Sequence, residues 1–173
     1  MMESTATATA VTLSRPRIGY AGGAFDLFHV GHLNILRHAK SQCDYLIAGV
    51  VSDDMLLRTK GARPIVPLAE RLEIVRHIDF VDEVIAEIEL DKLATWRARP
   101  FDVYFKGDDW KGSEKGIRLE RAFAQVGVEV AYFPYTVATS STVLRHALRA
   151  LNSRSQGAVS NRTEEFDRLR NEG

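Results

Sequence analysis

The sequence predicts an α/β fold, a doubly wound parallel sheet of Rossmann-like type in a single domain, on three observations. Apolar runs of strand length alternate with amphipathic stretches of helix length about five times along the chain. Residues 45–51 form an unbroken apolar run, which is typical of a strand buried on both faces of a parallel sheet. The 173 residues are enough for one domain with a full-sized core.

Each strand is expected where an apolar run is bounded by polar or turn-forming residues. The expected strands cover residues 17–21, 45–51, 84–86, 102–106 and 128–133. Open α/β sheets bind ligands beyond the carboxyl ends of their strands, where the strand order reverses. The motifs that follow these strands should therefore converge on one crevice.

The helices are expected from apolar residues at helical spacing and from capping residues. Val30, Leu33 and Leu36 predict a helix that runs to about Lys40. Serine and aspartate cap helices well, and proline ends them. The other expected helices are a short one after Ser52, one after Pro67, 90–99, 114–126 and one from Ser140 or Ser141 to Leu148, with a loop at 59–64.

The two ends of the chain differ in composition from the segment between them. Residues 1–14 are rich in Thr, Ala and Ser, which predicts a flexible leader, and residues 152–173 are mostly polar or charged, which predicts a solvated tail. The folded domain is expected over residues 15–151.

Charge and cysteine content exclude several classes of protein. The 23 basic and 23 acidic residues balance, so no general attraction to nucleic acid or membranes is expected. The single Cys43 excludes an internal disulfide framework and favours a reducing compartment. No apolar run approaches the ~20 residues that span a bilayer, and the N-terminus lacks the pattern of a secretory signal. We therefore expect a cytoplasmic protein.

The stretch from Gly22 to His32 is the main candidate for a functional site. A glycine-rich turn follows the first strand and leads into a helix, and His29 and His32 lie three residues apart at its start. Residues at this spacing share one face of a helix. A helix N-terminus offers free N–H groups and a positive dipole end, which suits phosphate. The glycines are expected to let the backbone approach that phosphate closely.

Four segments in order carry a resemblance to a known family. The string from Phe25 to His32 resembles the His-Xaa-Gly-His signature of the nucleotidyltransferase superfamily. The segments 59–61, 80–84 with 107–110, and 139–142 are similar to further elements of the cytidylyltransferase family typified by glycerol-3-phosphate cytidylyltransferase. This resemblance implies a Rossmann-like nucleotidyltransferase domain, a homodimer, and transfer of CMP from CTP to a small phosphorylated or phosphonylated alcohol with release of pyrophosphate.

The resemblance also implies roles for individual residues. His29, His32 and Lys60 would be catalytic, and Mg²⁺ would be bound by the triphosphate without protein ligands. Nucleotide binding is expected at Gly22, Gly23, Ala24, Phe25, Gly31, Gly107, Asp108, Trp110, Thr139, Ser140, Ser141 and Thr142. The candidate substrate contacts are Asp26, Arg63 and Arg71, although Asp26 suits shaping the turn better and Arg71 suits an exposed helix position equally well.

The sequence departs from the family at several positions. Ala24 stands where Thr is usual, Asp79 and Tyr135 where Arg is usual, and Val137 where Glu is usual. Either Arg63, Arg76 and Lys111 supply the missing positive charge, or the acceptor differs from glycerol 3-phosphate, which we favour.

Two other functions fit the same motifs. One is an adenylyltransferase that uses ATP and a sugar phosphate. By resemblance, the Gly-Asp-Asp-Trp segment at 107–110 favours cytidine, because adenylyltransferase relatives usually show Gly-Gly-Asp-Tyr there. The other is a nucleotide-binding regulatory protein without turnover, against which the intact His29, His32 and Lys60 count.

Overall fold

A five-stranded, wholly parallel sheet forms the centre of the computed structural model, which describes residues 15–134 and 140–151. The strand order is β3-β2-β1-β4-β5. The strands are β1 (Ile18–Gly23), β2 (Tyr45–Val51), β3 (Glu83–Glu87), β4 (Val103–Gly107) and β5 (Glu129–Phe133). The predicted fold class and all five predicted strands are confirmed. The predictions for residues 1–14 and 152–173 lie outside the described residues.

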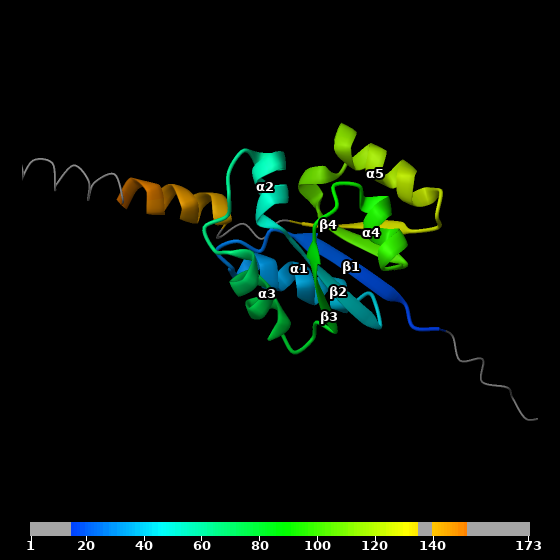
Figure 1. Ribbon diagram of the computed structural model, residues 1–173. Coiled ribbons are helices and arrows are strands. Elements are labelled where there is room, and N and C mark those ends of the chain that lie inside the picture. Colours follow the sequence, from blue (N-terminus) through cyan, green and yellow to red (C-terminus); the bar gives the residue numbers. More distant parts are fainter. Residues whose placement is uncertain (1–14, 135–139, 152–173) are drawn as a thin grey trace, which may run out of the picture.

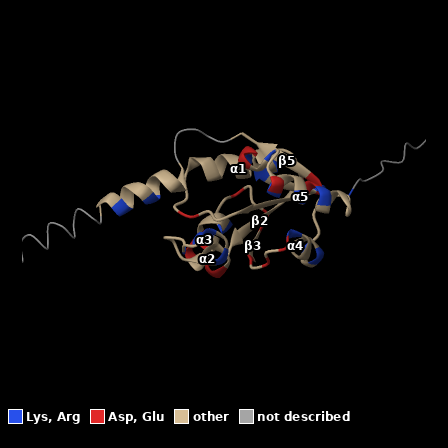
Figure 2. Cartoon of the chain, turned by 90° about the horizontal axis from the view of Figure 1, so that it is seen from above, with Lys and Arg blue, Asp and Glu red and all other residues tan. Residues whose placement is uncertain are grey.

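Helices cover both faces of the sheet, as a doubly wound fold requires (Figure 1). They are α1 (Val30–Lys40), α2 (Asp53–Lys60), α3 (Leu68–Arg76), α4 (Lys92–Ala98) and α5 (Glu114–Ala124). A further helical segment, residues 141–151, extends away from the sheet. Charged residues gather on the helices and loops, and the central strands carry few of them (Figure 2).

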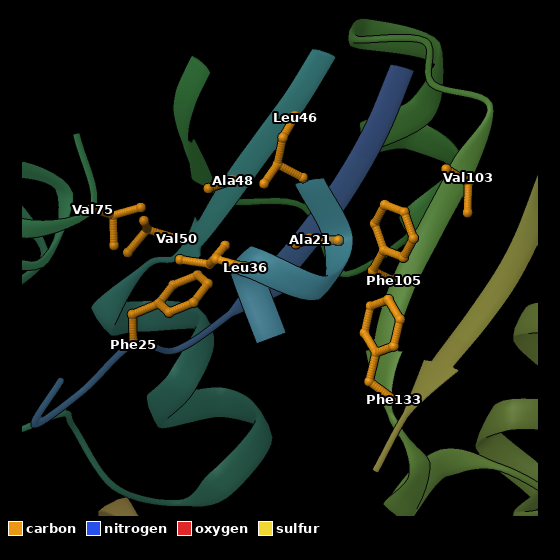
Figure 3. Packing of buried hydrophobic residues seen from close by; sticks show 11 residues of the cluster. Ala21, Phe25, Leu36, Leu46, Ala48, Val50, Val75, Val103, Phe105 and Phe133 are labelled. Carbon is orange, nitrogen blue, oxygen red and sulfur yellow. The ribbon is translucent and has the colours of Figure 1, made fainter. Parts of the chain in front are cut away.

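The core consists of one apolar cluster on each side of the sheet. On one side, Leu36 of α1 and Val75 of α3 pack with Phe105 and Phe133 from the sheet (Figure 3). On the other side, Phe123 of α5 packs with residues such as Tyr20 and Tyr104. Alternate residues of β1 and β4 therefore face opposite helical layers, and this alternation decides which of their last side chains reach which side of the site.

The end of α2 lies further along the chain than expected. Ser52 caps α2 as predicted, accepting a hydrogen bond from the Met55 N–H at 3.3 Å. The helix then includes the first two residues of the predicted loop and ends at Lys60, where Gly61 follows with a left-handed φ of 70°. The Thr59 hydroxyl donates to the Met55 carbonyl at 2.7 Å within this last turn. Lys60 therefore sits on a helix end and not in a loop.

The strand order reverses between β1 and β4. From β1, the chain crosses to β2 and β3 on one side, and it returns to β4 and β5 on the other. The connections therefore diverge at the carboxyl ends of β1 and β4 and leave room for a ligand there. No helix within residues 15–134 and 140–151 has the length and apolar character needed to cross a membrane.

Candidate active site

A cavity of about 280 Å³ opens at the carboxyl ends of β1 and β4, where the predicted crevice lies. Its walls come from the end of β1, the start of α1, the end of α2, the end of β4 with the turn after it, and the start of the helical segment 141–151. Predicted site residues that line it are Gly22, Gly23, Ala24, Phe25, Asp26, His29, Gly31, His32, Lys60, Gly107, Trp110, Ser140, Ser141 and Thr142. Thr139, Tyr135 and Val137 lie outside the described residues.

His29 caps α1 and points its second ring nitrogen toward the start of the last helix. Its Nδ1 accepts a hydrogen bond from the Gly31 N–H at 3.0 Å. A nitrogen that accepts this bond carries no proton, so the neutral ring bears its proton on Nε2. Nε2 lies 3.4 Å from the Ser141 hydroxyl. Burial lowers the pKa of His29, and the ring is therefore a neutral hydrogen-bond donor.

His32 lies beside His29 and deeper in the wall. The two ring centroids are 4.1 Å apart, and the rings of Phe25 and Phe28 also contact His32. Burial lowers the pKa of His32 to about 4, with smaller effects of His29 and Lys60 in the same direction and an opposing effect of the Asp26 carboxylate. Its Nδ1 is buried with no hydrogen-bond partner among the described residues. The pair thus offers neutral imidazoles with unused hydrogen-bonding capacity.

The turn that presents these histidines is strained and is held by Asp26. Phe25 and Leu27 have left-handed φ angles of 51° and 49°, which cost about 1 kcal/mol or more each in residues other than glycine. The Asp26 carboxylate, 1% exposed, accepts from the N–H groups of Ile65 and Val66 at 3.0 and 2.9 Å. Burial alone would raise the pKa of Asp26, but these bonds and the Arg145 guanidinium lower it.

The structure corrects the interpretation of Asp26 as a substrate contact. In addition to the two backbone bonds, its carboxylate accepts a hydrogen bond from Arg145 Nη2 at 2.7 Å. The Asp26 carbonyl accepts from the Ser141 hydroxyl at 2.8 Å. Asp26 therefore joins the opening turn to the loop before α3 and to the last helix, and its carboxylate oxygens already have partners.

The predicted substrate contact at Arg71 also needs correction. Its side chain is fully buried on α3. The guanidinium donates to the carbonyls of Ala24, Val51 and Val66 and forms an ion pair with Asp53. Through these bonds Arg71 fixes the segments at the ends of β1 and β2 to α3. Its side chain does not line the cavity.

The cations expected to supply the missing charge lie elsewhere. Arg63 is exposed and pairs with Asp54 at 3.1 Å, and Arg76 pairs with Glu73 at 3.0 Å on the surface of α3. Lys111 is exposed. None of the three lines the cavity, so the predicted substrate contact at Arg63 is corrected as well. Asp79 is exposed and lies just before β3, at the end of the sheet where the strands begin. The replacement of the usual Arg by Asp79 is therefore distant from the cavity.

Two cations that line the cavity were missed by sequence reasoning. They are Lys106, near the end of β4, and Arg145, one turn after Ser141. A signal existed for Lys106, since it directly precedes the Gly-Asp-Asp-Trp turn at a strand end. Ile35 also lines the cavity and was not predicted.

One prediction around the turn after β4 needs correction. Asp109 and not Asp108 lines the cavity with Trp110, because the chain turns outward into a 3₁₀ turn after Gly107. At Gly22, an added Cβ would lie 2.7 Å from a carboxylate oxygen of the buried Glu87. Gly22 lines the cavity, and packing on the α4–α5 side of the sheet also requires a glycine there.

Comparisons with known proteins agree with this geometry. The family model described as Cytidylyltransferase-like matches residues 20–147. A glycerol-3-phosphate cytidylyltransferase from Bacillus spizizenii is 35% identical over 130 residues, covering 75% of this chain and 95% of the relative. An ethanolamine-phosphate cytidylyltransferase from Arabidopsis thaliana is 39% identical over 95 residues, covering 52% of this chain and 22% of the relative. The chain thus spans less than a quarter of the plant relative.

A solved structure shows the same fold. The crystal structure of a lipopolysaccharide core biosynthesis protein from Thermoplasma volcanium superposes with a TM-score of 0.60 at 27% identity, covering 72% of this chain and 99% of that one. The family match covers most of the chain, including both histidines and the walls of the cavity. The chain therefore belongs to the cytidylyltransferase-like family.

Proposed function

We propose that the protein is an enzyme that transfers CMP from CTP to a small phosphorylated or phosphonylated alcohol. The observation that carries this proposal is the convergence of two helix starts, two neutral imidazoles and the cations Lys60, Lys106 and Arg145 on one cavity. In the reaction, an oxygen of the acceptor phosphate forms a bond to the α-phosphorus of CTP. The bond from that phosphorus to the bridging oxygen breaks, and pyrophosphate leaves with the electron pair.

The residues on the α1 side of the cavity suit the triphosphate. His29 Nε2–H and His32 can donate hydrogen bonds to phosphate oxygens, and the starts of α1 and of segment 141–151 both line the cavity, where the positive end of a helix dipole favours an anion. Such donors stabilise charge that develops on the leaving pyrophosphate. The reaction needs no protein nucleophile, so positioning and electrostatics supply the catalysis.

Mg²⁺ is expected to enter with the nucleotide. Within the described residues no group of three His, Cys, Asp or Glu side chains could hold a metal ion, and the Asp26 carboxylate already has partners. This donor set fits an ion bound through phosphate oxygens and water, as Mg²⁺ prefers. When bound there, it would neutralise part of the triphosphate charge.

Turnover and the choice of base are tested together. Pyrophosphate release with CTP or ATP and a panel of phospho-alcohols should show turnover with CTP, and titration calorimetry should show tighter binding of CTP. ATP binding as tight as CTP would favour the adenylyltransferase. Tight CTP binding without turnover on any acceptor would favour a regulatory protein.

The catalytic assignment is tested at His29. His29→Ala removes both the cap on α1 and the donor that faces Ser141. Loss of one preorganised donor lowers kcat by about 10²- to 10³-fold. The matched control is His77→Ala, an exposed histidine on the end of α3 that lies outside the cavity. Wild-type turnover in His29→Ala would refute the assignment.

The homodimer and the cytoplasmic location are also part of the proposal. They are supported by the resemblance to the family and, for the location, by the single Cys43. Light scattering after size-exclusion chromatography should give twice the mass of the 19.4 kDa chain. A monomer at micromolar concentration would contradict the dimer.

A further inference from the structure

Lys106 is a cation near the end of β4 that directly precedes the 107–110 segment and lies outside the motif segments described above. Strand alternation places Val103 and Phe105 in the cluster beneath α1, so Lys106 faces the α4–α5 side together with Tyr104. Its ammonium lies 4.4 Å from the centroid of the Trp110 ring. Among the described residues, the structure gives this ammonium no hydrogen bond and no ion pair. The Trp110 ring is therefore a close neighbour that does not neutralise its charge.

The charges that face Lys106 do not neutralise it. Lys60 approaches from α2 and Lys92 from α4, and both repel it, whereas Asp109 attracts it from the turn after β4. Lys92 itself forms an ion pair with the buried Glu87. Burial lowers the pKa of Lys106 to about 8, with Lys60 adding to the effect and Asp109 opposing it. A partly buried ammonium whose charge is not neutralised is unfavourable until an anion joins it.

The position of Lys60 indicates which anion would join Lys106. Lys60 lines the cavity from the end of α2, and its charge lowers the pKa of both His32 and Lys106, so it is close to both sides of the cavity. The donors suited to the triphosphate are on the α1 side, where Ser141 contacts His29 and the carbonyl of Asp26. Lys106 lies across the cavity from them, on the other face of the sheet. The transfer requires a second anion close to the α-phosphorus but outside the triphosphate cradle.

We propose that Lys106 binds the phosphate or phosphonate group of the acceptor and holds it facing the α-phosphorus of the nucleotide. This inference rests on the proposed function, and it gives the acceptor a separate cation from those that bind CTP. Lys60 then stands between the two anions and contacts the oxygens of both. The charge expected from Arg63, Arg76 or Lys111 is supplied by Lys106, which lines the cavity.

The test compares Lys106→Gln with wild type in steady-state kinetics. Loss of a charge-assisted contact should raise the KM for the acceptor by about 10- to 100-fold, while the dissociation constant of CTP changes less than about twofold. The control is Lys115→Gln, which removes an exposed lysine from α5 outside this cavity and should match wild type. Circular dichroism and CTP binding show whether each variant is folded.

The pH dependence gives a second readout. Lys106 binds an anion only when protonated, so the acceptor KM of wild type should rise as the pH increases through about 8. Lys106→Gln should lack this rise, and Lys106→Arg should keep a low KM above that pH. If Lys106 had only a structural role, these variants would lose stability, but the KM for the acceptor would not change separately from the dissociation constant of CTP.

Binding without turnover keeps the test independent of the proposed reaction. The probe is inorganic phosphate, titrated into protein saturated with a CTP analogue whose α,β-bridge is a methylene group. Wild type should bind phosphate about 10-fold or more tightly than Lys106→Gln. Weakened CTP binding in the variant, or unchanged phosphate binding, would overturn the inference. Absence of pyrophosphate release in wild type would refute the proposed function alone.

Discussion

Replacing Arg71 with methionine tests whether this residue supports the site or contacts substrate. The guanidinium is fully buried and donates to the carbonyls of Ala24, Val51 and Val66. Methionine fills much of the same space but donates no hydrogen bonds. Three carbonyls would then lose a charged donor, and Asp53 would lose its ion-pair partner. The loops after β1 and β2 would no longer be fixed to α3.

The expected loss of stability is large. Each buried carbonyl left without a donor costs about 1–3 kcal/mol, partly offset because no guanidinium has to be desolvated on folding. Breaking a buried pair by removing one partner costs about 3–5 kcal/mol in total. For a chain of this size, each kcal/mol lowers the melting temperature by about 2–4 °C. Arg71→Met should therefore melt about 6–20 °C below wild type.

The assay is thermal and urea unfolding followed by far-UV circular dichroism. The matched control is Arg76→Met on the same helix, because Arg76 is exposed and pairs only with Glu73 at the surface among the described residues. Such a pair contributes about 0.5 kcal/mol or less, so the control should melt close to wild type. If Arg71→Met were as stable as the control and raised the KM for substrate, the structural role would be wrong.

Two further predictions concern the titratable groups of the site. For His32, the folded pKa of about 4 lies below the ordinary 6.5, so the unfolded state binds more protons between these values and stability should rise with pH across that window, by up to about 3 kcal/mol. In His32→Asn, urea unfolding should show a weaker rise, and an unchanged slope would count against the buried neutral ring. Asp26→Asn should destabilise the protein by about 3 kcal/mol at neutral pH, whereas Asp54→Asn, an exposed partner of Arg63, should change stability by about 0.5 kcal/mol or less. Since the pKa of Asp26 is lowered on folding, its contribution is present above its ordinary pKa and is lost as the pH falls through the lower folded value; equal acid sensitivity of Asp26→Asn and wild type would contradict this.

Much of the fold follows from local patterns in the sequence. The unbroken apolar run at 45–51 coincides with β2, because a strand buried on both faces needs apolar residues at every position. Ser52 and Ser113 cap α2 and α5 through their own hydroxyls, which is a contact between near neighbours. Local patterns failed at the end of α2, which includes Thr59 and Lys60 and ends only at the left-handed Gly61.

The sequence alone determined the order of strands and helices, the placement of His29 and His32 at the start of α1, and the family signature, because each depends on residues close together in the chain. Only the tertiary structure decided the fate of the charged residues. Asp26 forms an ion pair with Arg145, which lies 119 residues further along the chain. Arg71 is buried and donates to the backbone of three loops, and Lys106 lines one cavity with Lys60 and Trp110. The charge on a side chain can be read from its sequence, but its partner depends on which distant segments the sheet brings together.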